Sequence, residues 1–127
     1  MKTKYLLTSV VVAFVVLIAL MFFSTKPAEG ADYTEFAQCV ADSGAKMYGA
    51  WWCSHCNNQK HAFGDSWKIL ENKEVYVECS TQTKTQTQIC IDEGIKGYPT
   101  WRFVDGTEQA GELSFEFLAQ KTGCPLN

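Results

Sequence analysis

Basic residues are too few and too dispersed in this sequence for a nucleic-acid-binding protein. The chain of 127 residues has 11 Lys and Arg against 14 Asp and Glu, which gives a formal net charge of −3. No basic stripe is formed, and nucleic-acid-binding domains usually have one. Internal repeats are also absent, and the length is that of one domain.

Histidine is scarce, with only 2 in the chain. A four-ligand zinc site could combine Cys53, Cys56, His61 and one further cysteine. Structural zinc sites usually have a second closely spaced Cys/His pair, and this sequence has none. We therefore expect no metal, and we expect His61 to be an ordinary surface or boundary histidine.

The chain has only one long hydrophobic run, which excludes a membrane domain of several helices within these residues. Lys2 and Lys4 precede the run, which extends from Tyr5 to Phe23. At about 19 residues it is long enough to span a bilayer. It is longer than the apolar core of a cleaved signal peptide, roughly 7–15 residues.

This run predicts an uncleaved transmembrane anchor over residues 5–23. Lysines on the short N-terminal side favour a cytoplasmic segment 1–4 and a domain outside the cytoplasm, at residues 32–127, after a tether at 24–31. The alternatives are a signal cleaved near Ala28-Glu29-Gly30 and a buried helix of the fold.

Cysteine, in contrast, is abundant. Six in so short a chain indicate an oxidising compartment. Cys53 and Cys56 lie two residues apart, directly after an apolar segment and before a helical pattern. A helix N-terminus favours a thiolate, so we expect Cys53 to attack, Cys56 to resolve, and His55 to add positive charge beside Cys53.

The other cysteines are candidates for structural disulfides. Cys79 and Cys90 flank a polar loop, and a bond between them would close about a dozen residues and contribute roughly 3 kcal/mol. A second redox pair that relays disulfides, or two free thiols, remain as alternatives. Cys39 and Cys124 are paired by elimination alone.

Hydrophobic periodicity predicts alternating helices and strands. The first helix has Asp32 as N-cap and Glu35 in the capping-box position, and Ser114 and Gly123 delimit the last one. The strands are expected at 45–52, 74–79 and 101–104, and a return strand runs up to 111. Further helices are expected after Cys53, with a kink at Gly64, and at 89–93. This order predicts a mixed α/β sheet with helices on both faces.

Two motifs resemble those of the thioredoxin superfamily, and the resemblance covers Asp32 to Cys124. One is Trp52-Cys53-Ser54-His55-Cys56, and the other is the segment from Gly94 to Thr100. The resemblance implies a thioredoxin-like fold with a cis peptide bond before Pro99. It also implies that the Tyr98 backbone pairs with an extended substrate, with Trp52, Tyr98 and Pro99 at the substrate-binding surface.

A closer similarity involves residues 47–53, His55-Cys56 and Gly97 to Trp101. These segments resemble thioredoxin-like domains linked to bacterial and plastid homologues of vitamin K epoxide reductase. That resemblance implies a separate, quinone-linked membrane partner. One position departs from the wider family: Met47 stands where many cytoplasmic thioredoxins have a buried acid, so the usual proton acceptor for Cys56 is missing.

The sequence thus predicts a membrane-anchored, extracytoplasmic thiol–disulfide oxidoreductase that acts on client proteins in oxidative folding and needs no cofactor. One alternative is an anchored reductase supplied with electrons by a membrane transporter. Another is a non-catalytic binding module that presents Tyr98 and Pro99 to a partner chain.

Overall fold

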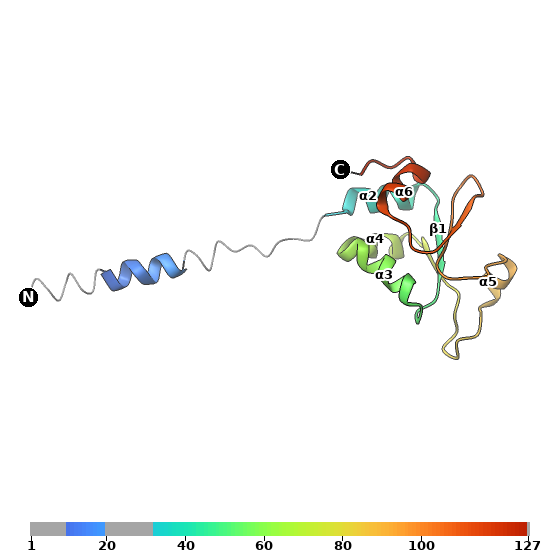
Figure 1. The fold of residues 1–127 in the computed structure, drawn as a ribbon, viewed down its shortest axis with the longest axis horizontal. Helices are drawn as coiled ribbons and strands as arrows, with labels where there is room; N and C mark the ends of the chain where they lie inside the picture. The colour runs from blue at the N-terminus through green and yellow to red at the C-terminus, as the bar shows by residue number, and fades with distance from the viewer. Residues whose placement is uncertain (1–9, 20–31, 127) are drawn as a thin grey trace, which may run out of the picture. The chain divides into compact units, whose positions relative to one another are not determined.

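The computed structural model describes residues 10–19 and 32–126 (Figure 1). The chain divides into two compact units, residues 1–31 and 32–127. In the first unit, residues 10–19 form a helix with exposed side chains. The rest of the predicted anchor over 5–23, the segment 1–4 and the tether at 24–31 lie outside the described residues. No helix in the described ranges combines the length and hydropathy needed to cross a membrane.

A four-stranded mixed sheet forms the centre of the second unit. Its spatial order is β2-β1-β3-β4. β1 pairs in parallel with β2 and antiparallel with β3, and β3 pairs antiparallel with β4. The bounds are Lys46–Gly49 for β1, Tyr76–Glu78 for β2, Thr100–Arg102 for β3 and Glu108–Ala110 for β4. β1 is therefore a central strand that delivers the chain to Cys53.

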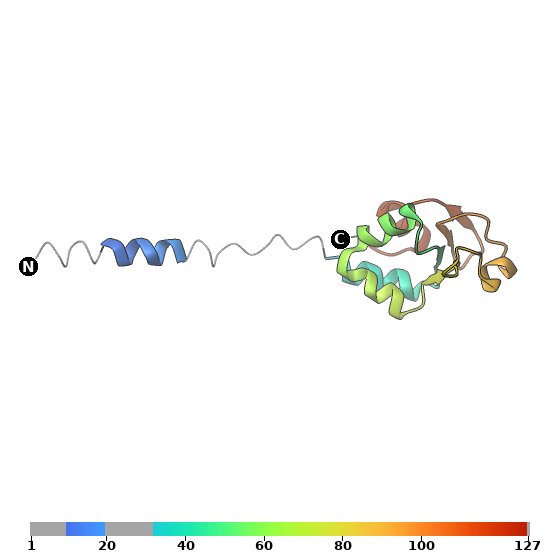
Figure 2. The ribbon, with the colours of Figure 1, turned by 90° about the horizontal axis from the view of Figure 1, so that it is seen from below.

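Helices cover both faces of this sheet (Figures 1 and 2). α2 contacts α4 and α6, and α3 contacts α4, so these four lie together on one side, whereas α5 lies on the other. Their bounds are Thr34–Asp42 for α2, Ser54–Phe63 for α3, Trp67–Asn72 for α4, Gln88–Asp92 for α5 and Phe115–Thr122 for α6. The predicted mixed α/β sheet is confirmed, and it is compatible with a thioredoxin-like fold.

Alternating residues of β1 divide the interior into two cores. Met47 belongs to the larger core, and its neighbour Tyr48 belongs to a smaller one on the opposite face. This is the two-residue period of a strand buried on both sides. In the larger core the rings of Phe36, Phe63 and Phe115 lie 4.6–6.0 Å apart, centroid to centroid, and join α2, α3 and α6.

Two disulfide bonds reinforce these cores. Cys39 in α2 is bonded to Cys124 beyond α6, with Cα atoms 5.7 Å apart. Cys79, directly after β2, is bonded to Cys90 in α5, with Cα atoms 5.5 Å apart. These are the two pairs that the sequence put forward.

Helix ends differ in two places from the sequence prediction. Asp32 is not the N-cap of α2, because the helix begins one residue later and Tyr33 holds that position; the Asp32 carboxylate still accepts the Thr34 N–H at 2.9 Å. Gly64 does not kink one long helix. Its φ of +55° ends α3, and a 3₁₀ turn leads into α4.

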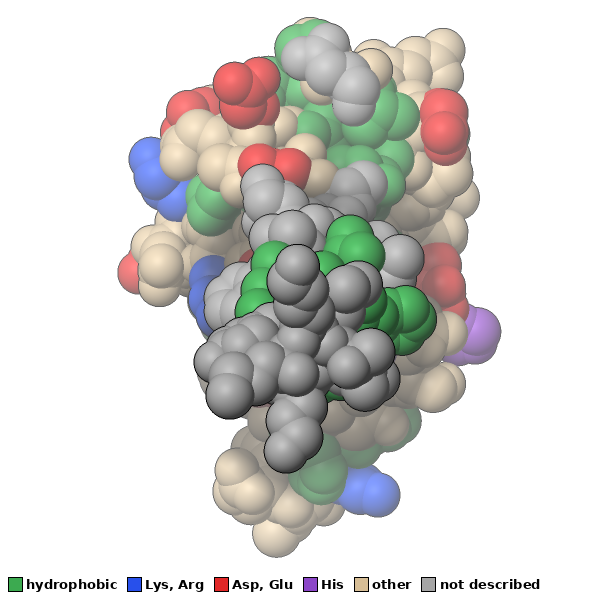
Figure 3. Space-filling model, turned by 90° about the vertical axis from the view of Figure 1, so that its left-hand side faces the viewer, with side chains coloured by type: hydrophobic (Ala, Val, Ile, Leu, Met, Phe, Trp, Pro, Cys, Tyr) green, Lys and Arg blue, Asp and Glu red, His purple; other side chains and the backbone are tan. Residues whose placement is uncertain are grey.

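The end of the domain follows the sequence prediction. The Ser114 side chain accepts the Phe117 N–H at 3.2 Å, and Gly123 ends α6 in the left-handed region at φ +73°. On the face shown in Figure 3, acidic and basic side chains of the described residues are interspersed.

Candidate active site

Cys53 is the N-cap residue of α3. The turn after β1 is fixed by a hydrogen bond from the Cys53 N–H to the Ala50 carbonyl at 3.0 Å. The Cys53 sulfur then accepts the Cys56 N–H at 3.3 Å. One of the N–H groups left unpaired at the start of a helix is thereby directed at this sulfur.

Cys56 lies one helical turn further on and is fully buried, whereas Cys53 keeps 8% of its surface exposed. Both are free thiols in this structure. Burial, together with the hydrogen bond to Cys53, raises the pKa of Cys56 to about 12. The pair therefore combines a residue that is slightly exposed, Cys53, with a fully buried thiol that stays protonated at neutral pH.

The segment before β3 faces the dithiol. The Cys53 thiol donates to the Tyr98 carbonyl at 3.6 Å, and the Tyr98–Pro99 peptide bond is cis, the isomer that the resemblance implied. Among the described residues, the Tyr98 N–H has no hydrogen-bond partner. Pro99 itself is fully buried, whereas Tyr98 is half-buried.

The two tryptophans before the dithiol are at the surface rather than in the core, with 43% of Trp51 and 42% of Trp52 exposed. Trp52 Nε1 donates to Ser80 Oγ at 2.7 Å, and Trp51 Nε1 donates to the Thr81 carbonyl at 3.2 Å. The Trp52 ring also meets the Tyr98 ring edge-on, with centroids 6.1 Å apart. The indoles thus extend an aromatic surface next to Cys53.

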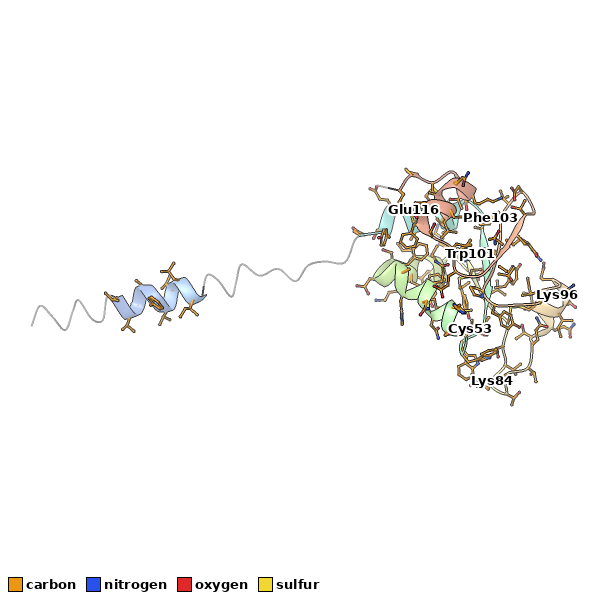
Figure 4. All side chains as sticks on the ribbon, in the orientation of Figure 1. Cys53, Lys84, Lys96, Trp101, Phe103 and Glu116 are labelled. Atoms are coloured by element: carbon orange, nitrogen blue, oxygen red, sulfur yellow. A yellow bond between two sulfur atoms is a disulfide. The ribbon has the colours of Figure 1, made fainter. Side chains whose placement is uncertain are left out.

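These contacts anchor the polar loop between Cys79 and Cys90. At its tip, the Lys84 ammonium lies 5.8 Å from the Trp51 ring centroid and 5.7 Å from that of Trp52. In Figure 4 Lys84 lies near the end of α3 that carries Cys53. The disulfide at the base of the loop therefore supports the surface beside the dithiol.

His55 pairs with a residue that the sequence did not indicate. Its Nδ1 lies 2.5 Å from a carboxylate oxygen of Glu112, which also accepts the Asn58 side-chain amide at 3.0 Å. Since a carboxylate only accepts, Nδ1 carries the proton. The hydrogen bonds from His55 and then Asn58 lower the pKa of Glu112. Within the described residues, the side-chain hydrogen bond of His55 goes to Glu112, and none joins His55 to Cys53.

The remaining candidates do not join this site. His61 is exposed on α3. No group of three or more His, Cys, Asp or Glu side chains suited to a metal ion occurs within the described ranges. Trp52, Tyr98 and the dithiol are the predicted residues that the fold brings together; Glu112 was missed, and no local pattern in the sequence points to it.

The comparisons with known proteins agree with a dithiol site. No protein-family model matches the sequence. The chain is similar to the thiol-disulfide oxidoreductase LTO1 of Arabidopsis thaliana. The two are 44% identical over 89 residues, which cover 66% of this chain. This chain spans only 22% of the length of that relative. The similarity supports a thioredoxin-like redox protein.

Proposed function

We propose that the domain over residues 32–127 is a protein thiol–disulfide oxidoreductase that acts through Cys53 and Cys56. The observation that carries the proposal is the asymmetry of the pair. Cys53 keeps 8% of its surface exposed and is hydrogen-bonded at the N-cap of α3, whereas Cys56 is fully buried and its pKa is raised. An attacking and a resolving thiol need this division.

Exchange proceeds through a mixed disulfide. The Cys53 thiolate attacks one sulfur of a client disulfide, and the second client sulfur leaves as a thiolate. Cys56 then loses its proton and attacks the Cys53 sulfur, which releases the first client sulfur. The client gains two electrons and Cys53–Cys56 becomes a disulfide. The reverse sequence oxidises a client dithiol, and neither direction requires a metal or an organic cofactor.

The client is expected to bind as an extended segment next to Tyr98. The free Tyr98 N–H can pair with a client carbonyl, and the Trp52 and Tyr98 rings flank the path toward Cys53. Pro99 is buried, so we assign it the positioning of Tyr98 rather than direct contact with the client.

We extend the proposal to the cellular setting. The apolar run over 5–23 anchors the domain outside the cytoplasm, where oxidised clients and a quinone-linked membrane partner are found. Six cysteines, four of them in disulfides, support an oxidising compartment. This setting favours oxidative protein folding over reduction as the net direction.

The test uses the full chain in detergent, with a reduced, unfolded secretory protein or an insulin disulfide as the client. The oxidised enzyme should restore activity to the reduced client, and the Cys53→Ser variant should not. Cys56→Ala should accumulate a mixed disulfide with the client on a non-reducing gel. Strong insulin reduction with no reoxidation activity would instead assign a reductase, and no exchange in either assay would leave only a binding module.

A further inference from the structure

A hydrogen-bonded tyrosine–glutamate pair lies behind Cys56, on strand β2. The Tyr76 hydroxyl donates to Glu78 Oε2 at 2.8 Å. The other oxygen of Glu78 accepts the N–H of Ser80 at 2.9 Å and the N–H of Trp51 at 3.2 Å. Glu78 accepts all three bonds, as an ionised carboxylate does, and they hold it in place.

Gly49 allows this pair to approach the buried thiol. A Cβ atom at Gly49 would lie 3.0 Å from Cys56 Sγ, 2.8 Å from the Tyr76 ring and 3.4 Å from the Tyr76 hydroxyl oxygen. The thiol and the phenol therefore converge on one position that a glycine leaves empty. Both atoms lie within 3.4 Å of that position, and one water molecule can bridge a gap of this size for proton transfer.

The charges around Cys56 favour transfer of its proton toward Tyr76. The Lys60 ammonium lies 3.6 Å from the Tyr76 ring centroid, and its positive charge favours the Cys56 thiolate. Burial, and then the bond to Glu78, strongly raise the pKa of Tyr76, which therefore remains a hydroxyl that can accept one proton while it donates another. The titratable groups that face this position from the surrounding elements are Cys53, Lys60, Tyr76, Glu78 and Tyr98.

We propose that Tyr76 and Glu78 form the proton relay for the resolving thiol. The Cys56 proton moves to the Tyr76 oxygen as Tyr76 passes its own proton to Glu78. The resulting Cys56 thiolate attacks Cys53, and in the reverse direction the proton returns. This inference rests on the proposed function. The Tyr76–Glu78 pair, on the strand next to β1, provides the proton acceptor that Met47 cannot be.

The experiment separates the two thiol steps. The full chain, reduced at Cys53–Cys56, is mixed in a stopped-flow instrument with one equivalent of dithiobis(nitrobenzoate). Attack by Cys53 releases one coloured thiolate, and resolution by Cys56 releases the second. Tyr76→Phe removes the hydroxyl, whereas Glu78→Gln retains a carbonyl oxygen for the two backbone donors. Tyr48→Phe is the matched control, because Tyr48 lies on the opposite face of the sheet near Arg102.

Both variants should keep the first phase and slow the second about a hundredfold at pH 7, the low end for loss of a general base. Their second phase should then rise about tenfold per pH unit, with the fraction of thiolate, while the unmodified chain shows a flatter profile. A wild-type second phase in both variants would overturn the relay. Equal slowing at every pH would also overturn it, since that marks a purely structural role. Absence of the first phase in the unmodified chain would overturn the proposed function, and the relay with it.

Discussion

The domain has two cysteine pairs near the same aromatic surface. One pair is a free dithiol, and the other is a buried disulfide. Cys53 and Cys56 lie at the first turn of α3, are unbonded, and keep 8% of the Cys53 surface exposed. Cys79 and Cys90 are bonded, and both are completely buried. Position in the fold is therefore the basis on which we propose that Cys53–Cys56 exchanges with clients and Cys79–Cys90 supports the structure.

The sharpest test of this difference is alkylation of the reduced chain. Burial and the hydrogen bond to Cys53 raise the pKa of Cys56, so this thiol stays protonated at pH 7. A limiting amount of iodoacetamide should therefore label Cys53 almost alone, as measured by peptide mass mapping. Labelling of Cys56 before Cys53 would reverse the assignment of attacking and resolving thiols.

The second test removes the buried pair. Cys79→Ala together with Cys90→Ala should lower the free energy of unfolding by roughly 3 kcal/mol, because the unfolded loop is no longer restricted. Denaturant unfolding measures this loss. Turnover of a small disulfide reagent should remain nearly intact, because the dithiol itself is unchanged.

The same double variant also tests the alternative role. If it unfolds like the unmodified chain but no longer passes electrons to a membrane fraction, the Cys79–Cys90 pair is a relay rather than a structural bond. Mild reductant provides a control, since it should open Cys53–Cys56 first.

A smaller effect on client binding is expected at Trp52, where the polar loop contacts the surface beside the dithiol. Trp52→Phe keeps an aromatic ring but removes the hydrogen bond to Ser80, which typically contributes about 1 kcal/mol. When Trp52→Phe is combined with Cys56→Ala, we expect less mixed disulfide with a client protein. The rate with a small disulfide reagent should change little. Trp67→Phe, which removes an indole bond to Glu71 away from the dithiol, is the matched control. Equal client capture in the Trp52→Phe and Trp67→Phe variants would show that the polar loop does not contribute to client binding.

The smallest effect should come from the exposed His55–Glu112 pair. Hydrogen bonds lower the pKa of Glu112 from 4.5, so their stabilisation is present above that pH and is lost as the pH falls through the lowered value. The unfolding midpoints of the unmodified chain and Glu112→Gln should therefore differ at pH 7 and converge in acid. A difference that persists in acid would contradict the assignment.

Local features of the fold were predictable, because they depend on neighbouring residues. The Ser114 cap and the left-handed Gly123 each act within a few positions. Strand lengths were overestimated, since apolar residues continue into the turns where pairing has ended.

The contacts around the dithiol were not predictable in the same way. Glu112 lies 57 positions from His55, and the Trp52–Ser80 bond spans 28. The approach of Tyr76 to Cys56 depends on strand register and on the missing side chain of Gly49. Such contacts form only when segments distant in the sequence pack together, so hydrophobic periodicity and motif spacing do not predict them.

The Cys39–Cys124 bond makes the domain a closed covalent ring for mechanical purposes. The dithiol, the polar loop and all four strands lie between these two positions. A pulling force applied at the two ends of the chain would pass through the disulfide and bypass the segment it encloses. In a single-molecule stretching experiment, the residues from 40 to 123 should lengthen only after that bond has been reduced.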